Sequence, residues 1–451
     1  MERGISLLGL LVMMLLAWAM SSHKKRVSLR IVGGGLLLQF AFAFLILKTD
    51  AGEASFAAIG DFFRSVLSFV DAGSAFLFDV FPRNETETLP AQYTLWRSFA
   101  FGILPTIIFF SALMSVMYHL GIMQLVVKAL AWLMQKTLGT SGAETLSAAA
   151  NIFVGQTEAP LVIRPYVADM TMSELNVVMV GGFATIAGGV LAAYVGMGID
   201  AGHLLTASVI SAPAALMIAK IMQPETESSM TQGNVKGTAD SPSVNVIEAA
   251  AEGTSAGLQL ALNVGAMLIV FTAFVAMGNA FVSWVGGLVA HYLSYPSAQK
   301  WTMELAFGYV FAPFAWLMGV KSDECLAAGG ILGVRTVLNE FYAYAQLGKM
   351  ETPFSLRTQM ILTYALCGFA NFSSIGIQLG GIGGVAPGRR SDLAKLGLRA
   401  MAGGTLAAFM TACVAGFLLS DADLQRRDDD RKANAAAVES ADEIKSESPG
   451  K

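Results

Sequence analysis

A cluster of polar side chains interrupts an otherwise apolar part of the chain, in the segment NIFVGQTEAP at residues 151–160. An ionisable group at membrane depth is a functional-site hypothesis by default, because a charge is costly to bury there. Gly155 and Pro160 disfavour a continuous helix through the cluster. Backbone without helical hydrogen bonds is tolerated in a bilayer only where protein covers it or where it lines a wet cavity. The segment therefore predicts a substrate site built around Asn151, Gln156, Thr157 and Glu158.

The composition of the chain indicates a membrane protein. Hydrophobic residues make up 55% of the sequence and charged residues 14%, against roughly 25% charged in typical soluble domains. The net charge of −4 shows no basic excess that would favour nucleic acid. The cysteines Cys325, Cys367 and Cys413 are odd in number and far apart, and the four histidines are scattered. We therefore expect no disulfide framework, metal centre, cofactor or enzymatic site.

Long apolar runs predict the membrane spans of the first half. Residues 5–21 form the first span, and the basic cluster at 23–26 follows it, which places that loop in the cytoplasm and the amino terminus outside. Pro213 predicts a break in residues 203–219, and the paired glycines of Thr185-Ile-Ala-Gly-Gly189 predict local unwinding within 175–199. The remaining expected segments are spans at 31–47 and 98–118, an amphipathic surface segment at 56–78, a loop at 82–90 and an interfacial helix at 123–136.

The second half repeats this pattern. A long span at 253–290 is followed by a short apolar segment at 305–320, and then by an apolar stretch at 326–347 with Asn339-Glu340 near its middle. Residues 360–387 are uncharged and carry Asn371-Phe-Ser-Ser374 in their centre. Two halves that each hold a charged re-entrant candidate and an interrupted span are typical of repeat-built secondary transporters.

The predicted fold is an all-α polytopic membrane protein with about eight transmembrane helices and two re-entrant hairpins in an inverted-repeat transport core. Both termini are expected outside, because the basic loop at 389–399 precedes the last span. The expected regions are two N-terminal spans with an external surface segment (1–95), a first repeat (96–222), a cytoplasmic linker (223–252), a second, inverted repeat (253–420) and a disordered tail (421–451).

Three motifs carry a family resemblance: GQTEAPLVIRPY at 155–166, TVLNEFYAY at 336–344 and CGFANFSSIGIQLGGIG at 367–383. In this order and spacing they resemble the signature regions of the concentrative nucleoside transporter family, over roughly residues 95–420. The resemblance implies a homotrimer that moves a nucleoside together with a cation, and hairpins at about 141–167 and 322–347.

The resemblance also implies roles for individual residues. Gln156, Thr157 and Glu158 would read the nucleobase, with Val190 and Phe369 packing against it. The ribose hydroxyls would be held by Glu340, Asn371 and Ser374. This chemistry suits a nucleoside, a neutral ligand with many donors and acceptors, because buried polar partners reject analogues that lack the matching group.

A sodium site is implied at the join of the first hairpin and the unwound span. Its ligands would be the Asn151 side chain, the Val154 and Ile186 carbonyls and the Thr185 hydroxyl. Sodium-coupled members are expected to carry serine where this chain has Thr185, and the extra methyl can crowd the ion. Proton coupling through Glu158 or Glu340 is the alternative.

The same residues could instead have purely structural roles, and the sequence leaves these alternatives open. The two carboxylates can form plain ion pairs, Glu158 with Arg164 and Glu340 with Arg335. Single asparagines such as Asn151 and Asn371 fit interhelical hydrogen bonding, Phe369 alone fits a core, and the Gly376-xxx-Gly380 pattern fits helix packing. Their clustering beside broken helices favours a site.

The sequence thus predicts a cation-coupled symporter that imports nucleosides across a bacterial inner membrane, with sodium favoured over protons. The alternative is a membrane nucleoside sensor or gate that binds without transport. Gradient-dependent accumulation separates the two. The absence of a phosphate-gripping lysine or glycine-rich cradle argues against nucleotides as substrates.

Overall fold

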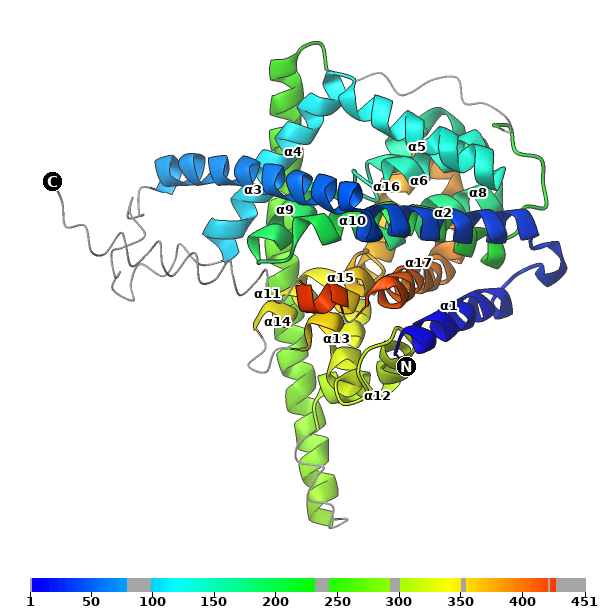
Figure 1. Cartoon of the computed structure of the whole chain (residues 1–451). Helices are drawn as coiled ribbons and strands as arrows, with labels where there is room; N and C mark the ends of the chain where they lie inside the picture. Colours follow the sequence, from blue (N-terminus) through cyan, green and yellow to red (C-terminus); the bar gives the residue numbers. More distant parts are fainter. Residues whose placement is uncertain are drawn as a thin grey trace.

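The computed structural model describes residues 2–78, 99–231, 243–292, 301–349, 354–420 and 422–426. Within these ranges every regular element is helical and there is no strand (Figure 1). The predicted all-α fold is confirmed. The loop predicted at 82–90 lies outside the described residues, as do 232–242 of the predicted linker and 427–451 of the predicted tail.

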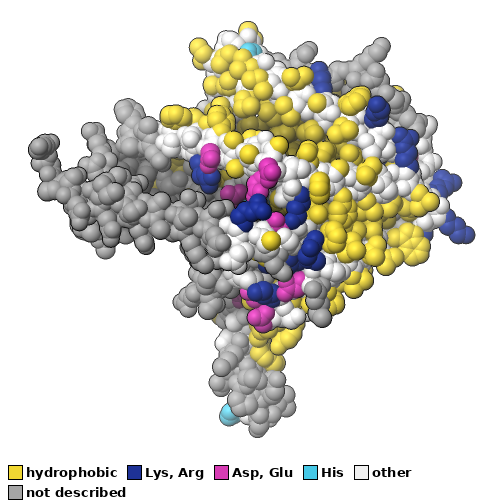
Figure 2. Space-filling model, in the orientation of Figure 1, with side chains coloured by type: hydrophobic (Ala, Val, Ile, Leu, Met, Phe, Trp, Pro, Cys, Tyr) yellow, Lys and Arg dark blue, Asp and Glu magenta, His cyan; other side chains and the backbone are white. Residues whose placement is uncertain are grey.

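Seven helical segments of the described chain are long and apolar enough to cross a membrane. They are Glu2–Ala19, Leu29–Lys48, Ala100–His119, Met172–Gly196, Ala201–Met222, Val246–Tyr292 and Pro387–Leu418. The further span predicted at 360–387 is divided into two shorter helices, α15 (Leu356–Leu366) and α16 (Phe372–Val385). Figure 2 shows a broad hydrophobic surface, with Lys and Arg gathered at the edge where the first two helices join.

The N-terminal helices are α1 (Glu2–Ala19), α2 (Leu29–Lys48) and α3 (Asp50–Phe78). The first packs on α17 (Arg390–Leu418), and the second packs on α10 (Ala201–Met222). The third begins six residues before the segment predicted at 56–78 and leaves Phe62, Phe69 and Leu77 exposed along its length. An exposed face of this kind suits lipid rather than water.

The rest of the chain contains the same order of elements twice. A long helix is followed by a second helix, a broken pair, an interrupted pair and a closing helix. In the first half these are α4 (Leu104–His119), α5 (Ile122–Leu138), α6 (Gly142–Ala150) with α7 (Ala159–Val162), α8 (Met172–Ala184) with α9 (Gly188–Gly196), and α10. In the second half they are α11 (Val246–Tyr292), α12 (Met303–Leu317), α13 (Cys325–Val337) with α14 (Glu340–Lys349), α15 with α16, and α17.

Several boundaries differ from the sequence prediction. Pro213 lies inside α10 without ending it, because neighbouring groups can satisfy the backbone that a proline frees in a membrane helix. α11 begins at Val246, within the range predicted as linker, and α17 begins at Arg390, ten residues before the predicted span. The predicted unwinding near Thr185 is confirmed, since α8 ends at Ala184 and α9 begins at Gly188.

A stripe of small residues lets α11 approach α4 closely. Ala249, Gly253, Gly257 and Ala261 recur every fourth residue and are buried. A Cβ atom placed on Gly257 would lie 2.8 Å from the Ile108 Cα atom, and one on Gly253 would lie 2.7 Å from the Ala112 Cα atom. Such spacing is typical of membrane helices whose backbones touch.

Gly376 and Gly380, whose spacing fits helix packing, make no close helix contact within the described chain. Both glycines are exposed on α16, and no heavy atom of the described residues lies within 4 Å of a Cβ placed on either. Small-xxx-small patterns that do mediate close packing in the described chain lie on α11 and at Gly329 and Gly333 of α13. Spacing alone does not distinguish the two, because it does not show which helix face is covered.

A buried ion cluster ties the start of α6 to α10. Lys220 Nζ lies 2.8 Å from the Glu144 carboxylate and 3.2 Å from that of Glu225. It also donates to Ser173 Oγ at 2.9 Å. Because a buried charge needs a partner, this cluster explains how the apolar neighbourhood of α6 accommodates Glu144.

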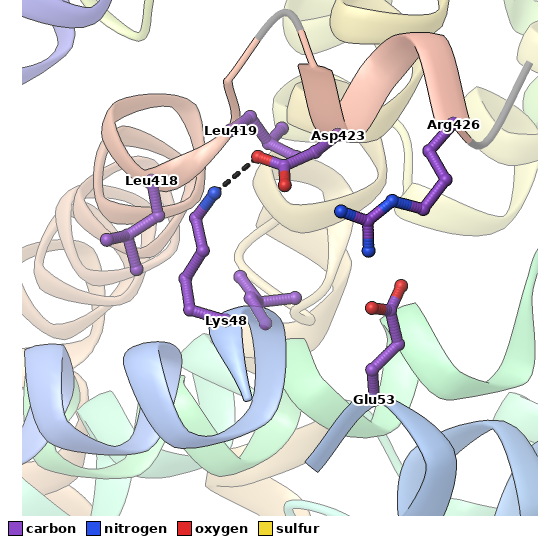
Figure 3. A pocket seen from close by; sticks show the side chains of 7 residues that line it. Lys48, Glu53, Leu418, Leu419, Asp423 and Arg426 are labelled. Carbon is purple, nitrogen blue, oxygen red and sulfur yellow. Dashed lines mark hydrogen bonds and ion pairs between the residues drawn. The ribbon is translucent and has the colours of Figure 1, made fainter. Parts of the chain in front are cut away.

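The residues that follow α17 fold back onto the α2–α3 turn (Figure 3). Residues 422–426 are helical, at the beginning of the range predicted to be disordered. Asp423 forms an ion pair with Lys48 and accepts a hydrogen bond from the Ser420 amide at 2.8 Å. Burial opposes ionisation of Asp423, but the hydrogen bonds from Lys48 and Ser420 outweigh it and lower the pKa of its carboxyl to about 2. Arg426 and Glu53 line the same small pocket as Lys48 and Asp423, and Figure 3 shows Arg426 pointing toward Glu53.

The close contact of α4 and α11 predicts that Gly257→Ala destabilises the protein. The added methyl group meets backbone, which cannot turn aside, and overpacking of this kind costs about 1–3 kcal/mol. We expect a lower thermal unfolding midpoint for the purified variant. Gly287→Ala on the same helix is the control, because no described heavy atom lies within 4 Å of its Cβ position. Equal midpoints for the two variants would contradict the contact.

Candidate functional site

Four interruptions of helical structure lie at the centre of the described chain. They fall at residues 151–158, 185–187, 338–339 and 367–371. The first two are joined where the Gly188 amide donates to the Phe153 carbonyl at 3.0 Å. The second and fourth are joined where the Phe369 amide donates to the Thr185 carbonyl at 3.3 Å. The breaks therefore satisfy part of one another's backbone hydrogen bonding.

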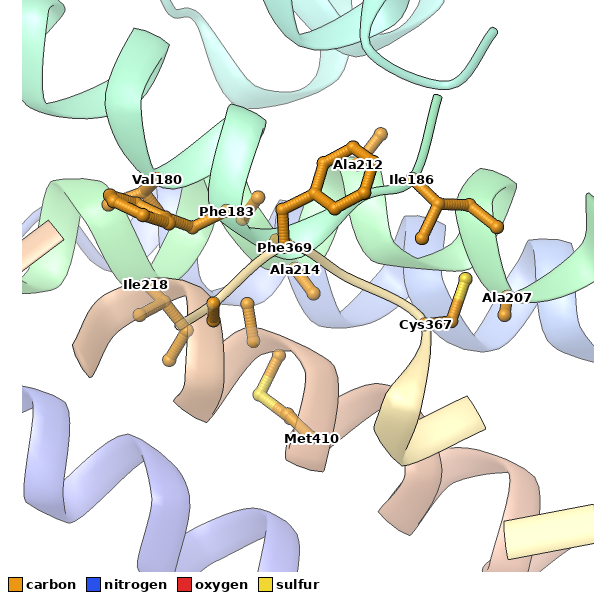
Figure 4. Packing of buried hydrophobic residues seen from close by; sticks show 14 of the residues in the cluster. Val180, Phe183, Ile186, Ala207, Ala212, Ala214, Ile218, Cys367, Phe369 and Met410 are labelled. Carbon is orange, nitrogen blue, oxygen red and sulfur yellow. The ribbon is translucent and has the colours of Figure 1, made fainter. Parts of the chain in front are cut away.

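Apolar side chains pack around the crossing of the second and fourth breaks. Figure 4 shows the extended segment that carries Cys367 and Phe369 passing beside Phe183 and Ile186. These four residues belong to one buried cluster. Val190, at the start of α9, belongs to it too. Val190 and Phe369, the two apolar residues predicted to contact the base, therefore lie in the packed surroundings of the breaks.

A chain of hydrogen bonds connects most of the predicted polar residues. Gln156 Nε2 donates to Ser374 Oγ at 3.2 Å, and the Ser374 amide donates to Asn371 Oδ1 at 2.9 Å. Asn371 Nδ2 then donates to Glu340 Oε2 at 3.0 Å. All four side chains are buried. Residues separated by more than 180 positions thus form one polar network. The sequence motifs contained these residues but did not predict that they bond to one another.

Glu340 is the buried carboxylate of this network. It is the first residue of α14, and only 4% of its surface is exposed. Its second oxygen, Oε1, accepts a hydrogen bond from the Tyr194 hydroxyl at 2.8 Å. Two donors therefore fix the carboxylate from two different helices.

Asn371 both caps a helix and hydrogen-bonds to Glu340. It is the N-cap residue of α16, and its side-chain oxygen satisfies an otherwise unpaired amide of the first turn. Its side-chain nitrogen remains for Glu340. The start of α16 is thus attached to the start of α14.

Glu158 and Thr157 face a different direction from Gln156. Glu158 is exposed and lines a hollow of about 350 Å³ between α4, α5, α11 and the first two breaks. That volume lies within the usual range of ligand sites. Thr157 is half-buried, and its methyl group lies against Gly381 of α16. The first break therefore presents one amide to the buried network and one carboxylate to the hollow.

The residues predicted to bind sodium surround the first two breaks. Asn151 is 1% exposed, and its Nδ2 donates to the Ser147 carbonyl at 3.1 Å. The Thr185 hydroxyl donates to the Gly181 carbonyl at 2.9 Å. The Asn151 amide also lies beside Gly181, where a Cβ atom would come within 3.3 Å of its nitrogen. Ile186 is buried and Val154 is half-buried.

The alternative ion pairs are not formed. Across the described residues no ion pair joins Glu158 to Arg164 or Glu340 to Arg335 within 4.0 Å. Arg335 is fully buried, its Nη2 donates to the Gly368 carbonyl at 3.4 Å, and its guanidinium lies 5.8 Å from the Phe409 ring centroid. Its contacts brace the fourth break instead of neutralising Glu340 by direct contact.

Sequence reasoning missed two members of the network. Gln378 of α16 donates to Gln156 Oε1 at 3.0 Å, and Tyr194 of α9 donates to Glu340. Gln378 stands inside the motif at 367–383 as a polar residue in an apolar span, which is a usable signal. Tyr194 gives no such signal, because an aromatic residue in an apolar helix is ordinary.

Comparison with known proteins decides the family. Residues 203–416 match the model of the Na+ dependent nucleoside transporter C-terminus, and residues 8–81 match that of the N-terminus. Residues 100–201 match a nucleoside recognition (Gate) model. An uncharacterized transporter of Haemophilus influenzae is 46% identical over 420 residues, which cover 92% of this chain and 97% of the relative. The chain belongs to the concentrative nucleoside transporter family.

Animal relatives of this transporter family are longer. Solute carrier family 28 member 3 of Eptatretus stoutii is 45% identical over 432 residues, covering 92% of this chain and 60% of the relative. Sodium/nucleoside cotransporter 1 of Mus musculus is 44% identical over 434 residues, which cover 92% of this chain and 64% of the relative. The chain therefore spans less than two thirds of the length of these animal relatives.

Solved structures of the family share the fold. CNTnw in an inward-facing substrate-bound state superposes with a TM-score of 0.84 at 40% identity, covering 92% of this chain and 98% of that one. A CNTnw variant in an intermediate state superposes with a TM-score of 0.86 at 40% identity. The match covers 93% of this chain and 100% of that one. The family and the relatives named are membrane transporters and not enzymes.

The Tyr194–Glu340 contact predicts the effect of a single hydroxyl in this family member. Tyr194→Phe leaves a buried acceptor of Glu340 without its donor, which costs roughly 1–3 kcal/mol. We expect a lower thermal unfolding midpoint for the purified, ligand-free protein. Tyr342→Phe makes the same chemical change on α14, where no described side chain bonds the hydroxyl, and should leave the midpoint unchanged. A Tyr194→Phe midpoint equal to that of the control would show that the carboxylate does not depend on this donor.

Proposed function

We propose that this protein is a cation-coupled symporter that imports nucleosides, and that sodium is the coupling ion. The observation that carries the proposal is the buried network of Gln156, Ser374, Asn371 and Glu340, joined at the broken ends of helices. It offers neutral donors and acceptors with a single carboxylate. Such a set suits a neutral ligand rich in hydroxyl and amide groups. The mouse relative is named a sodium/nucleoside cotransporter.

The proposed substrate roles follow the two faces of the site. Glu340, Asn371 and Ser374 would hold the ribose hydroxyls, because a carboxylate accepts strong hydrogen bonds from O–H groups. Gln156, Thr157 and Glu158 would contact the base, with Val190 and Phe369 packing on its ring. Of these five residues only Glu158 lines the 350 Å³ hollow, so a base in the hollow would reach this carboxylate but not the Gln156 amide.

Oxygen atoms that accept no hydrogen bond from the described residues support the proposal of a sodium ion at the predicted site. Asn151 Oδ1 is buried and has no hydrogen-bond partner among the described residues. No described N–H group donates to the carbonyls of Val154 or Ile186 either. The Thr185 hydroxyl uses its proton on Gly181, which leaves its oxygen lone pairs available. Sodium prefers oxygen ligands, and unwound carbonyls beside helix ends are how transporters supply them.

The sodium proposal predicts how uptake depends on the ion. We expect nucleoside uptake into proteoliposomes to rise with external sodium at fixed pH. Asn151→Ala and Thr185→Val should each raise the sodium concentration for half-maximal uptake by roughly tenfold, the loss expected from a charge-assisted contact. Thr206→Val is the matched control, because the Thr206 hydroxyl makes the same bond to a carbonyl four residues earlier, in α10.

Other outcomes identify the alternatives. Uptake that ignores sodium but collapses when the proton gradient is dissipated would assign the coupling to protons, with Glu158 or Glu340 as the titrating group. Nucleoside binding without gradient-dependent accumulation would favour the sensor or gate.

We also propose a bacterial inner-membrane location, a homotrimeric assembly and external termini. The basic residues Lys24, Lys25 and Arg26 lie in the α1–α2 turn, and Arg389 and Arg390 lie at the start of the last span. Positive residues favour the cytoplasm in short loops. The hollow beside Glu158 is also lined by Gln124 and Glu252. In this orientation these two residues lie near the cytoplasmic ends of α4 and α11, so the hollow would form a route for release of the nucleoside into the cytoplasm.

Cysteine labelling tests this orientation. Ala422→Cys is expected to react with a membrane-impermeant maleimide in cells with a permeabilised outer barrier, because residue 422 is exposed just beyond the last span. Ser22→Cys, exposed in the α1–α2 turn, should be protected in the same cells. The three native cysteines are buried and give little background. Labelling of Ser22→Cys with protection of Ala422→Cys would reverse the topology.

A further inference from the structure

Gln378 is a fully buried amide that no predicted role uses. It lies on α16, one turn beyond Ser374, and 0% of its surface is exposed. Its Nε2 donates to two acceptors, the Met179 carbonyl of α8 at 3.1 Å and Gln156 Oε1 at 3.0 Å. Gln378 therefore links a rigid helix backbone to the amide of Gln156.

The Met179 carbonyl fixes which end of the Gln378 amide faces it. A backbone carbonyl can only accept, so the amide nitrogen of Gln378 must point toward it. The opposite orientation would bring two oxygen atoms together in a buried place. Because the same nitrogen also faces Gln156, the atom of Gln156 that meets it must be the oxygen.

The space around the two amides leaves little freedom to rearrange. A Cβ atom on Gly182 of α8 would lie 2.8 Å from both Gln156 Cβ and Gln378 Nε2. Glycine at this position is what allows both side chains to lie against α8. The pair is thus held by backbone on one side and by α16 on the other.

We propose that Gln378 is a positioning residue that fixes Gln156 as a hydrogen-bond donor toward the substrate. Gln156 Oε1 is occupied by Gln378, and Gln156 Nε2 faces Ser374, the predicted ribose ligand. An amide nitrogen carries two hydrogens, and only one is used on Ser374. The other selects substrates that place an acceptor, a carbonyl oxygen or an unprotonated ring nitrogen, beside Gln156. The inference rests on the proposed function, since it assigns the atom type that the site reads.

Analogues that lose one acceptor at a time test the proposal. The probes are adenosine with its 1-deaza, 3-deaza and 7-deaza forms, and uridine with its 2-thio and 4-thio forms, in which an acceptor is removed or weakened. Binding to the purified protein is measured by competition with a radiolabelled nucleoside. In the wild type we expect at least one such analogue to bind roughly fivefold to tenfold more weakly than its parent, the loss of one hydrogen bond.

The variant Gln378→Met keeps the length of the side chain and removes both hydrogen bonds. The Gln156 amide is then free to turn either end toward the ligand, so the ratio between parent and analogue should fall to within about twofold. Gln39→Met is the matched control. Gln39 is equally buried and donates to Thr411 Oγ1 at 3.3 Å, away from the site, and its variant should keep the wild-type ratio.

A second variant keeps the proposal testable if Gln378→Met does not fold. In Gln378→Glu the buried, neutral carboxyl group has one proton, which it donates to the Met179 carbonyl. Toward Gln156 it can then only accept, so Gln156 must turn its nitrogen toward it and present its oxygen to the ligand. The penalty for losing an acceptor should again disappear. A wild-type ratio in either folded variant would overturn the role of Gln378, and so would a wild type that binds every analogue as tightly as its parent. Failure of the wild type to bind any nucleoside would instead remove the proposed function itself.

Discussion

Irregular backbone at membrane depth must be covered, and this constraint organises the transporter. Four helix interruptions expose N–H and C=O groups that no water of the bilayer core can satisfy. The chain meets the cost by bringing the breaks together, so that Gly188 bonds to Phe153 and Phe369 bonds to Thr185. Helix ends also carry partial charge. The same assembly that satisfies the backbone therefore produces a concentrated polar centre inside an apolar protein.

The surroundings of this centre differ in how tightly they are packed. α4 and α11 touch along a stripe of small residues that includes Gly253 and Gly257. The breaks, by contrast, are held by single hydrogen bonds and by apolar packing around Phe369. A hollow of about 350 Å³ lies between Glu158 of the first break and α4 and α11. The start of α9, just after the second break, packs directly on α4, where a Cβ atom on Gly189 would lie 2.9 Å from Ser111 Oγ. The polar centre thus adjoins the α4–α11 pair partly across space and partly through packing.

The sequence predicted the all-helical class, most spans and the break at Thr185, because apolar length and paired glycines act locally. It also predicted the polar residues that gather at the centre, since charges are rare in apolar segments. It did not predict that Gln156 and Glu158, two residues apart, face different surroundings, because that depends on the path of irregular backbone. Tyr194 was missed for a related reason. Its role arises from a partner 146 positions away, which no local pattern encodes.

The internal hydrogen bonds of the polar centre have a consequence for turnover. Gln156, Ser374, Asn371 and Glu340 form hydrogen bonds with one another. A ligand bound at these residues, as we propose, would have to exchange with these partners. Its affinity would then be the difference between new bonds and old ones, and neutral exchanges of this kind yield little net free energy. Because the old bonds re-form as the ligand leaves, departure does not strand buried polar groups. A carrier gains from this, since a cargo held too tightly is never released.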